Sequence, residues 1–253
     1  MQSSGQIVEG YFDPIKPTQR LARLVGFLYL MQMAMGVFGQ SFVRDQLIVR
    51  GDAAKTAHNI TEAEQLFRFS IAGDLLTYAT VIVLIWGLYL LLRAVHRDLA
   101  LLALILRLAE NAVLCAATAN SLVTLRLLSS NSSLAALNEG QRFALGILTI
   151  NTQGAGMSIA FILLGFGSAI FSYLWWKSGY IPRWLAGLGV IGSLLLPLIT
   201  LAAIVFPSLS PYSLAFMIPL GLFEVGLGLW LLIKGIKLPL HLQSNAPAET
   251  FVN

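Results

Sequence analysis

Arg107, Glu110 and Asn111 stand close together in the middle of a long apolar run. At about 100° per residue, a helix places these three residues on one face together with Thr118 and Ser121. The opposite face of the run consists of Leu, Val, Ala and Ile. A guanidinium, a carboxylate and an amide at this spacing predict a site that binds a charged or polar ligand or exchanges protons. Alternatively, the charges only pair with each other and hold helices together.

A second carboxyl group, that of Glu224, lies near the middle of another apolar run. Gly221 and Gly228 share its helical face and would let a neighbouring helix come close. Arg107 lies at a similar depth in an oppositely directed helix. The sequence therefore predicts that Glu224 pairs with Arg107.

Asp74 and Tyr78 form a third candidate group, on one face of the outer half of a further apolar run. The predicted spans contain three carboxyl groups, those of Asp74, Glu110 and Glu224, and one guanidinium, that of Arg107. If all four groups are ionised, about two surplus negative charges remain. An ionised group near the centre of a bilayer costs about 2.5–3.5 kcal/mol. We therefore expect a proton, water or a cation to reach the carboxyl groups, unless Asp74 lies close enough to the interface to be hydrated.

Membrane-spanning helices must position these residues. The chain of 253 residues is 57% hydrophobic and 11% charged, whereas soluble domains carry about 25% charged residues. Several apolar runs reach the roughly 20 residues that cross a hydrocarbon core of about 30 Å. We predict an all-α bundle of six transmembrane helices in a single domain, 1–253. The predicted spans are about 24–43, 69–92, 99–125, 154–176, 184–206 and 213–233, between a polar arm (1–20) and a polar tail (238–253).

The basic residues predict that both termini are cytoplasmic. Of the 16 Lys and Arg residues, nine flank the inner ends of the spans in this orientation and six flank the outer ends. The outer basic residues are interleaved with acidic ones, as the positive-inside pattern requires. The net charge of +4 therefore indicates orientation in a lipid bilayer and not nucleic-acid binding.

Two segments are predicted to interrupt the simple pattern of spans. Residues 44–63 form a polar loop, and Thr61 with Glu64 forms a capping box that opens the next helix. Residues 143–176 are uncharged but too long for one span. Residues 141–153 are therefore predicted either to extend outside the hydrocarbon or to form a broken turn.

No metal or cofactor is expected. His58, His96 and His241 lie on separate loops or in the tail, and Cys115 is the only cysteine. A cysteine-based metal site and an intrachain disulfide are thereby excluded. The sequence also contains no HExxH motif and no Ser/His/Asp motif.

Short motifs along nearly the whole chain resemble a bacterial family of polytopic membrane proteins, the domain-of-unknown-function family four-three-eight-six. They lie at 51–60, 66–68, 107–110, 178–185 and 229–235, the last preceded by Glu224. The most specific is 178–185, SGYIPRWL, where Gly179 suits a helix C-terminal cap and Pro182 a helix start. The resemblance implies an integral protein of the bacterial inner membrane and carries no catalytic residue over.

Three functions are compatible with these residues. We favour a protein that binds or transports a small molecule, a lipid or an ion at an intramembrane site. An intramembrane enzyme would act on a lipid with Glu110 or Glu224 as acid or base, and the lack of a metal or nucleophile motif counts against it. A structural or accessory subunit would use the charged residues only to hold its helices together. The candidate binding residues are Arg107, Glu110, Asn111 and Glu224, with Asp74 and Tyr78 toward the outer mouth of the site.

Overall fold

The computed structural model describes residues 18–49, 51–128 and 137–237, and this part of the chain contains helices and no strand. Six of the helices are long and apolar enough to cross a membrane. The prediction of an all-α membrane bundle with six spans is therefore confirmed. The predicted arm, 1–20, and the tail, 238–253, lie almost wholly outside the described residues.

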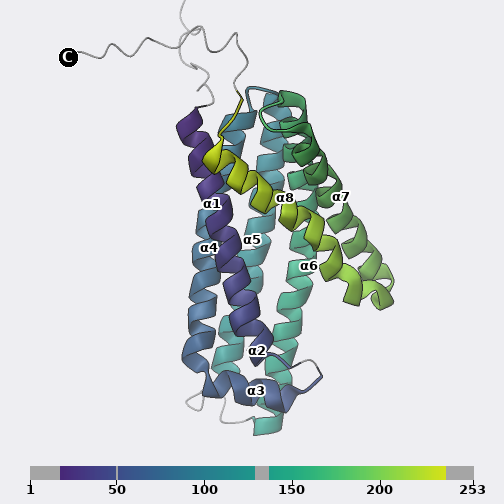
Figure 1. The fold of residues 1–253 in the computed structure, drawn as a ribbon. Helices are drawn as coiled ribbons and strands as arrows, with labels where there is room; N and C mark the ends of the chain where they lie inside the picture. Colours follow the sequence, from purple (N-terminus) through teal and green to yellow (C-terminus); the bar gives the residue numbers. More distant parts are fainter. Residues whose placement is uncertain (1–17, 50, 129–136, 238–253) are drawn as a thin grey trace, which may run out of the picture.

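Figure 1 shows how the helices are arranged. The long helices are α1 (Gln19–Val37), α4 (Glu64–Leu92), α5 (Arg97–Leu128), α6 (Glu139–Ser178), α7 (Arg183–Val205) and α8 (Ser213–Ile233). Between α1 and α4 lie a π-helix, η1 (Phe38–Arg44), and two shorter helices, α2 (Asp45–Leu47) and α3 (Ala53–Glu62). A 3-10 helix, η2 (Pro207–Tyr212), connects α7 to α8.

The segment 44–63, predicted as a polar loop, is mostly helical. The chain continues from α1 through η1 into α2, and α3 lies across the end of the bundle (Figure 1). The predicted capping box is wrong: Thr61 lies in the last turn of α3, and its Oγ1 donates a hydrogen bond to the carbonyl of Ala57 at 2.8 Å. Glu64 begins α4 without a side-chain cap.

Helix α6 is one continuous helix of 40 residues, so the broken turn considered for 141–153 is wrong. Its capping box lies at Asn138 and Gln141: each side-chain oxygen accepts a hydrogen bond from the other residue's backbone N–H, at 2.9 and 3.0 Å. At 1.5 Å per residue the helix is about 60 Å long, so it extends beyond a hydrocarbon core of about 30 Å. Gly179 ends α6 with φ of 66°, as predicted, and Pro182 is the N-cap of α7.

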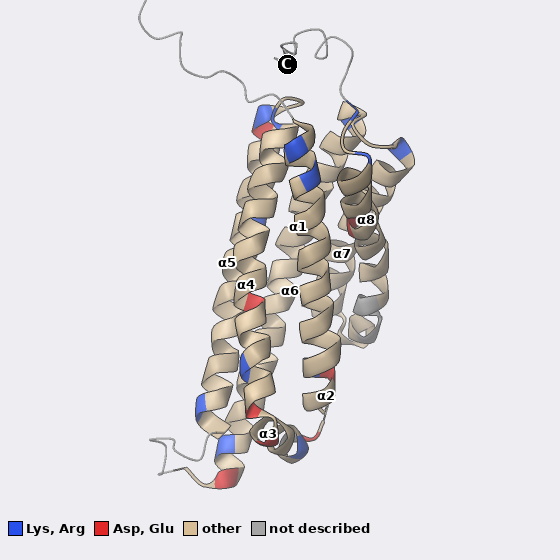
Figure 2. Ribbon diagram, turned by 60° about the vertical axis from the view of Figure 1, so that its left-hand side comes forward, with Lys and Arg blue, Asp and Glu red and all other residues tan. Residues whose placement is uncertain are grey.

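The six long helices form a closed ring. Each packs on the next in chain order, from α1 to α4, α5, α6, α7 and α8, and α8 packs back on α1. Within the described chain, neither α1 nor α8 has close backbone contacts with α5 or α6. The helices of the ring therefore surround a common interior (Figures 1 and 2).

Both described ends of the chain lie at one end of the ring, which we call the basic end because Lys and Arg gather there (Figure 2). The side chain of Gln19 donates to the carbonyl of Ile236 at 2.5 Å and accepts from its N–H at 3.0 Å. The carbonyl of Tyr180 accepts from the N–H of Lys237 at 3.0 Å, and its ring meets Trp175 edge-on. The SGYIPRWL motif is therefore a packed corner that anchors the segment after α8.

Glycines bring α1 and α8 together, as predicted for Gly228. A Cβ on Gly228 would lie 2.9 Å from Cδ2 of Leu30, and a Cβ on Gly26 would lie 2.6 Å from the backbone nitrogen of Leu232. Backbone atoms cannot rotate away as the end of a side chain can. The closure of the ring therefore depends on the absence of side chains at this crossing.

Gly26→Ala is expected to lower the free energy of unfolding by about 1–3 kcal/mol, the usual cost of overpacking, because the added methyl group meets the backbone of α8. Thermal unfolding of the purified protein in detergent measures the change. Gly36→Ala is the matched control in the same helix, since a Cβ there has no atom within 4 Å. Equal stability of the two variants would contradict the close crossing.

Candidate functional site

The polar face predicted for the third span is turned into the ring. Arg107 and Glu110 are each 4% exposed, and Asn111, Thr118 and Ser121 are buried as well. Leucine and isoleucine side chains on the opposite face of α5 are exposed, where lipid would surround the bundle. Amphipathic periodicity in the sequence thus correctly identifies which face of α5 points inward.

Arg107 and Glu110 form an ion pair within α5. Nη1 of Arg107 lies 3.3 Å from Oε2 of Glu110, but the orientation does not make a hydrogen bond, and both atoms are buried without a hydrogen-bond partner. Oδ1 of Asn111 is also buried and unpartnered, while its Nδ2 donates to the carbonyl of Tyr78 at 3.2 Å. Buried polar atoms normally have hydrogen-bond partners, so Nη1 of Arg107, Oε2 of Glu110 and Oδ1 of Asn111 each retain capacity for a further hydrogen bond.

Glu224 lies in the same electrostatic environment, although it comes from a different helix. It is 8% exposed on α8, and its charge interacts with those of Arg107 and Glu110 on α5. The hydroxyl of Tyr29, a buried residue of α1, lies within electrostatic range of Glu224 and Arg107. We call Tyr29, Arg107, Glu110 and Glu224 the charged centre.

The predicted direct pairing of Arg107 with Glu224 is not found; Arg107 pairs with Glu110 instead. Glu110 lies one turn along the same helix, so its side chain reaches the guanidinium without requiring any approach of α8. The carboxyl group of Glu224 has no ion-pair partner among the described residues. Its charge is therefore compensated only at longer range.

Asp74 does not belong to the charged centre. It pairs with Arg44, the last residue of η1, through Nη2 to Oδ2 and through Nη1 to Oδ1 at 3.5 Å. Sequence reasoning assigned Arg44 to an outer loop, whereas the helical continuation of α1 holds it against α4. The surplus charge is therefore smaller than predicted: Glu110 and Glu224 against Arg107 leave one negative charge.

Three buried hydroxyls near the interior were missed by sequence reasoning: those of Tyr29, Ser172 and Ser193. Oγ of Ser172 on α6 and Oγ of Ser193 on α7 are buried without a hydrogen-bond partner. Small hydroxyl residues are common in packed membrane helices, so their types alone carry no signal. For Tyr29, the signal is a single phenol on the otherwise apolar inner face of the first span.

A row of polar contacts extends from the charged centre toward the end that α3 covers, which we call the α3 end. The hydroxyls of Tyr78 and Thr118 lie 3.1 Å apart, and Oγ of Ser121 donates to Oε1 of Gln153 at 2.5 Å. Tyr78, a predicted site residue, thus joins α4 to α5 at both its carbonyl and its hydroxyl. This row fixes the walls of the ring between its centre and the α3 end.

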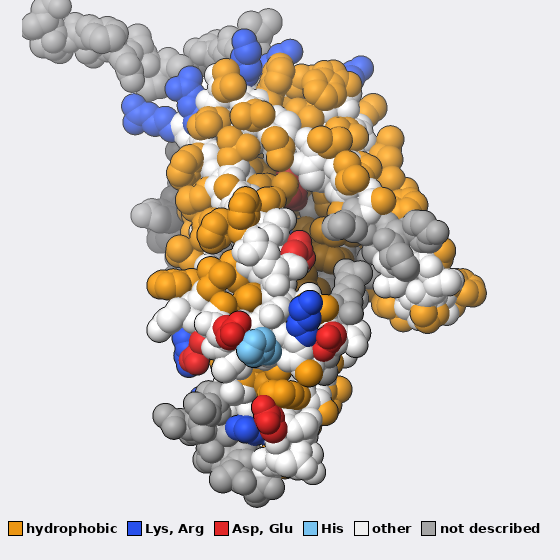
Figure 3. Space-filling view, turned by 60° about the horizontal axis from the view of Figure 1, so that its bottom comes forward, with side chains coloured by type: hydrophobic (Ala, Val, Ile, Leu, Met, Phe, Trp, Pro, Cys, Tyr) orange, Lys and Arg blue, Asp and Glu red, His pale blue; other side chains and the backbone are white. Residues whose placement is uncertain are grey.

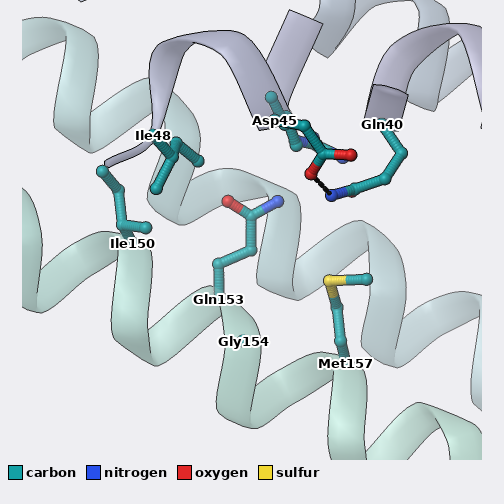
Figure 4. A pocket seen from close by; sticks show the side chains of 8 residues that line it. Gln40, Asp45, Ile48, Ile150, Gln153, Gly154 and Met157 are labelled. Atoms are coloured by element: carbon teal, nitrogen blue, oxygen red, sulfur yellow. Dashed lines mark hydrogen bonds between the residues drawn. The ribbon is translucent and has the colours of Figure 1, made fainter. Parts of the chain in front are cut away.

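A pocket of about 180 Å³ lies at the α3 end, between α6 and the segment formed by η1 and α2. In Figure 4, Gln40 and Asp45 lie on one side of it and Gln153 and Met157 on the other. Figure 3, viewed partly from below, shows that the surface is hollowed beside the diverging α7 and α8, with acidic atoms in its depth. A second, mostly apolar pocket of about 560 Å³ borders Asp74 on the flank between α1 and α4.

Comparison with known proteins identifies a family but no activity. The family model described as "Domain of unknown function (DUF4386)" matches residues 24–235, which contain every residue of the charged centre. No curated protein and no solved structure matches the chain.

Proposed function

Because this chain belongs to the DUF4386 family, whose description assigns no activity, we propose a function from the site itself. The protein binds a small positively charged guest, either a proton or a cation, in the interior of its helix ring. It does so as an integral protein of the inner membrane, with the charged centre as the binding site.

The charge balance of the charged centre carries this proposal. Glu110 and Glu224 are buried with Arg107 as the one positive charge, and a buried ionised group is costly unless it is compensated. One proton or one monovalent cation makes the cluster neutral. Oδ1 of Asn111 has no hydrogen-bond partner, and Oε2 of Glu110 is held only by its ion pair with Arg107, so both are acceptors suited to such a guest.

The two alternative functions have less support. A lipid-modifying enzyme needs a nucleophile next to its base, and among the described residues no serine or cysteine is hydrogen-bonded to Glu110 or Glu224. A purely structural cluster would be fully paired. Here Glu224 has no ion-pair partner in the described chain, Oδ1 of Asn111 has no hydrogen-bond partner, and the ion pair of Arg107 with Glu110 makes no hydrogen bond.

Thermal unfolding in the presence of cations tests the proposal. A guest that binds only the folded state stabilises it by about 2.7 kcal/mol at one hundred times its dissociation constant. We expect Na⁺, K⁺, tetraethylammonium or a lower pH to raise the melting temperature of the wild type at constant ionic strength, and Glu224→Gln to lose this response.

The matched control is Glu64→Gln, which removes a carboxylate from an exposed pair with Arg68 at the start of α4. This variant should respond to the same cations as the wild type does. If no cation and no change of pH distinguishes Glu224→Gln from the wild type, the charged centre has no positively charged guest.

A further inference from the structure

The two ends of the ring differ in how they are packed. At the basic end, an apolar core cluster fills the interior, with a residue of at most 1% exposure from every long helix. Representative members are Val25, Leu91, Ala103, Leu174, Leu185 and Leu231. This cluster lies between the charged centre and the basic end, and it extends to Tyr29 of the charged centre and to Leu220, one turn before Glu224 on α8.

Glycines show where space remains inside the ring. A Cβ on Gly87, near the basic end, would lie 2.6 Å from Cγ2 of Val25, and close contacts also occur toward the α3 end, where a Cβ on Gly156 would lie 2.7 Å from Cβ of Ala117. Toward the α3 end, a Cβ on Gly154 would meet nothing within 4 Å, and one on Gly221 would meet only Cε of Met33, at 3.9 Å. Gly221 lies one turn from Glu224 on the same face of α8, so there is room for an added side chain directly beside the charged centre.

Polar side chains line the open part. The amide of Gln153 borders the pocket at the α3 end, and its Oε1 is held by Ser121. Oε1 is thereby engaged, and the amide nitrogen of Gln153 remains on the pocket side, opposite Asp45 (Figure 4). Helices α7 and α8 lean away from α1 toward this end (Figure 1), and the space-filling view shows a hollowed surface beside them (Figure 3).

We propose that the charged centre is reached from the α3 end alone, through the pocket between η1 and α6, and that the apolar core cluster closes the basic end. This inference rests on the proposed function, because it identifies the route of the positively charged guest. By the distribution of basic residues, the α3 end faces the outside of the cell. The guest therefore arrives from the periplasmic side.

Cysteine accessibility in the full-length protein tests this route. In a Cys115→Ser background, Gly154→Cys places a thiol in the open pocket, Met33→Cys places one beside Gly221, and Ala103→Cys places one in the core cluster. The protein is reconstituted in sealed vesicles, and membrane-impermeant cationic or anionic methanethiosulfonate reagents are added to one side at a time.

We expect the thiols at positions 154 and 33 to react from the α3 side only and the thiol at position 103 to react from neither side. At position 33 the cationic reagent should react about tenfold faster than the anionic one, because a cleft with negative charge concentrates cations. Glu224→Gln should reduce this preference. Labelling of position 33 from the basic side, or its absence from the α3 side, would overturn the proposal.

The outcome is separable from that of the cation experiment. If the thiols at positions 154 and 33 react from the α3 side only but cations do not change the melting temperature, the proposed route is supported and the binding of a positively charged guest is contradicted. If cations raise the melting temperature but position 33 is labelled from the basic side, the binding of a positively charged guest is supported and the proposed route is contradicted. Folding of each cysteine variant is checked by its elution in size-exclusion chromatography and by its melting temperature.

Discussion

Arg107→Met is expected to lower the free energy of unfolding by about 3–5 kcal/mol, the usual cost of removing one partner from a buried ion pair. The substitution leaves Glu110 and Glu224 buried without the positive charge that compensates them. Methionine retains an unbranched stem, which is needed because a Cβ on Gly167 would already lie 2.8 Å from Cγ of Arg107. Denaturant or thermal unfolding in detergent measures the loss.

Arg126→Met is the matched control, since Arg126 is an exposed residue of the same helix. Its stability should remain within about 0.5 kcal/mol of the wild type, as for most surface substitutions. A charge exchange tests whether position or total charge matters: Arg107→Glu combined with Glu224→Arg should recover stability that Arg107→Glu loses. If Arg107→Met is as stable as Arg126→Met, Arg107 does not compensate the carboxyl groups.

The combined variant Glu110→Gln and Glu224→Gln is expected to be less stable than the two single variants together predict. Each single substitution leaves Arg107 with one carboxylate and makes the charged centre neutral. The double substitution leaves the guanidinium buried without any carboxylate, at a cost of about 3–5 kcal/mol. A double-mutant cycle in detergent measures the interaction energy directly.

The sign of that interaction distinguishes two arrangements. If both carboxyl groups share Arg107, the loss in the double variant exceeds the sum of the single losses. Additive effects would mean that Glu224 and Arg107 do not sense each other, although they lie within electrostatic range. The single variant Glu224→Gln would then remain useful only as a test of guest binding.

Taken alone, the sequence determined the membrane class and the inner face of α5. Six apolar runs predicted six spans, because crossing about 30 Å of hydrocarbon requires about 20 apolar residues whatever the tertiary fold. The polar stripe from Arg107 to Ser121 identified the buried face, because helical periodicity is a local property. The cap at Gly179 and the close helix crossing at Gly228 were predicted for the same reason.

The sequence did not decide between the partners of the charged residues: it left open whether Arg107 pairs within its own helix or with Glu224, and it identified neither Arg44 nor Tyr29 as a partner. Arg44 neutralises Asp74, Arg107 pairs with Glu110, and Tyr29 joins the charged centre from the far side of the ring. Which inward faces meet depends on the order of the helices around the ring and on their tilts. These are properties of the packing of all six helices together.

The difference between the two ends of the ring likewise belongs to the tertiary structure. Apolar residues occur in both halves of every span, so hydropathy does not distinguish a filled end from an open one. The apolar core cluster packs the interior toward the basic end, and the surface is hollowed toward the α3 end, where α7 and α8 lean away from α1 (Figures 1 and 3). The residues that can hold charge are thus a property of the sequence, and their accessibility is a property of the fold.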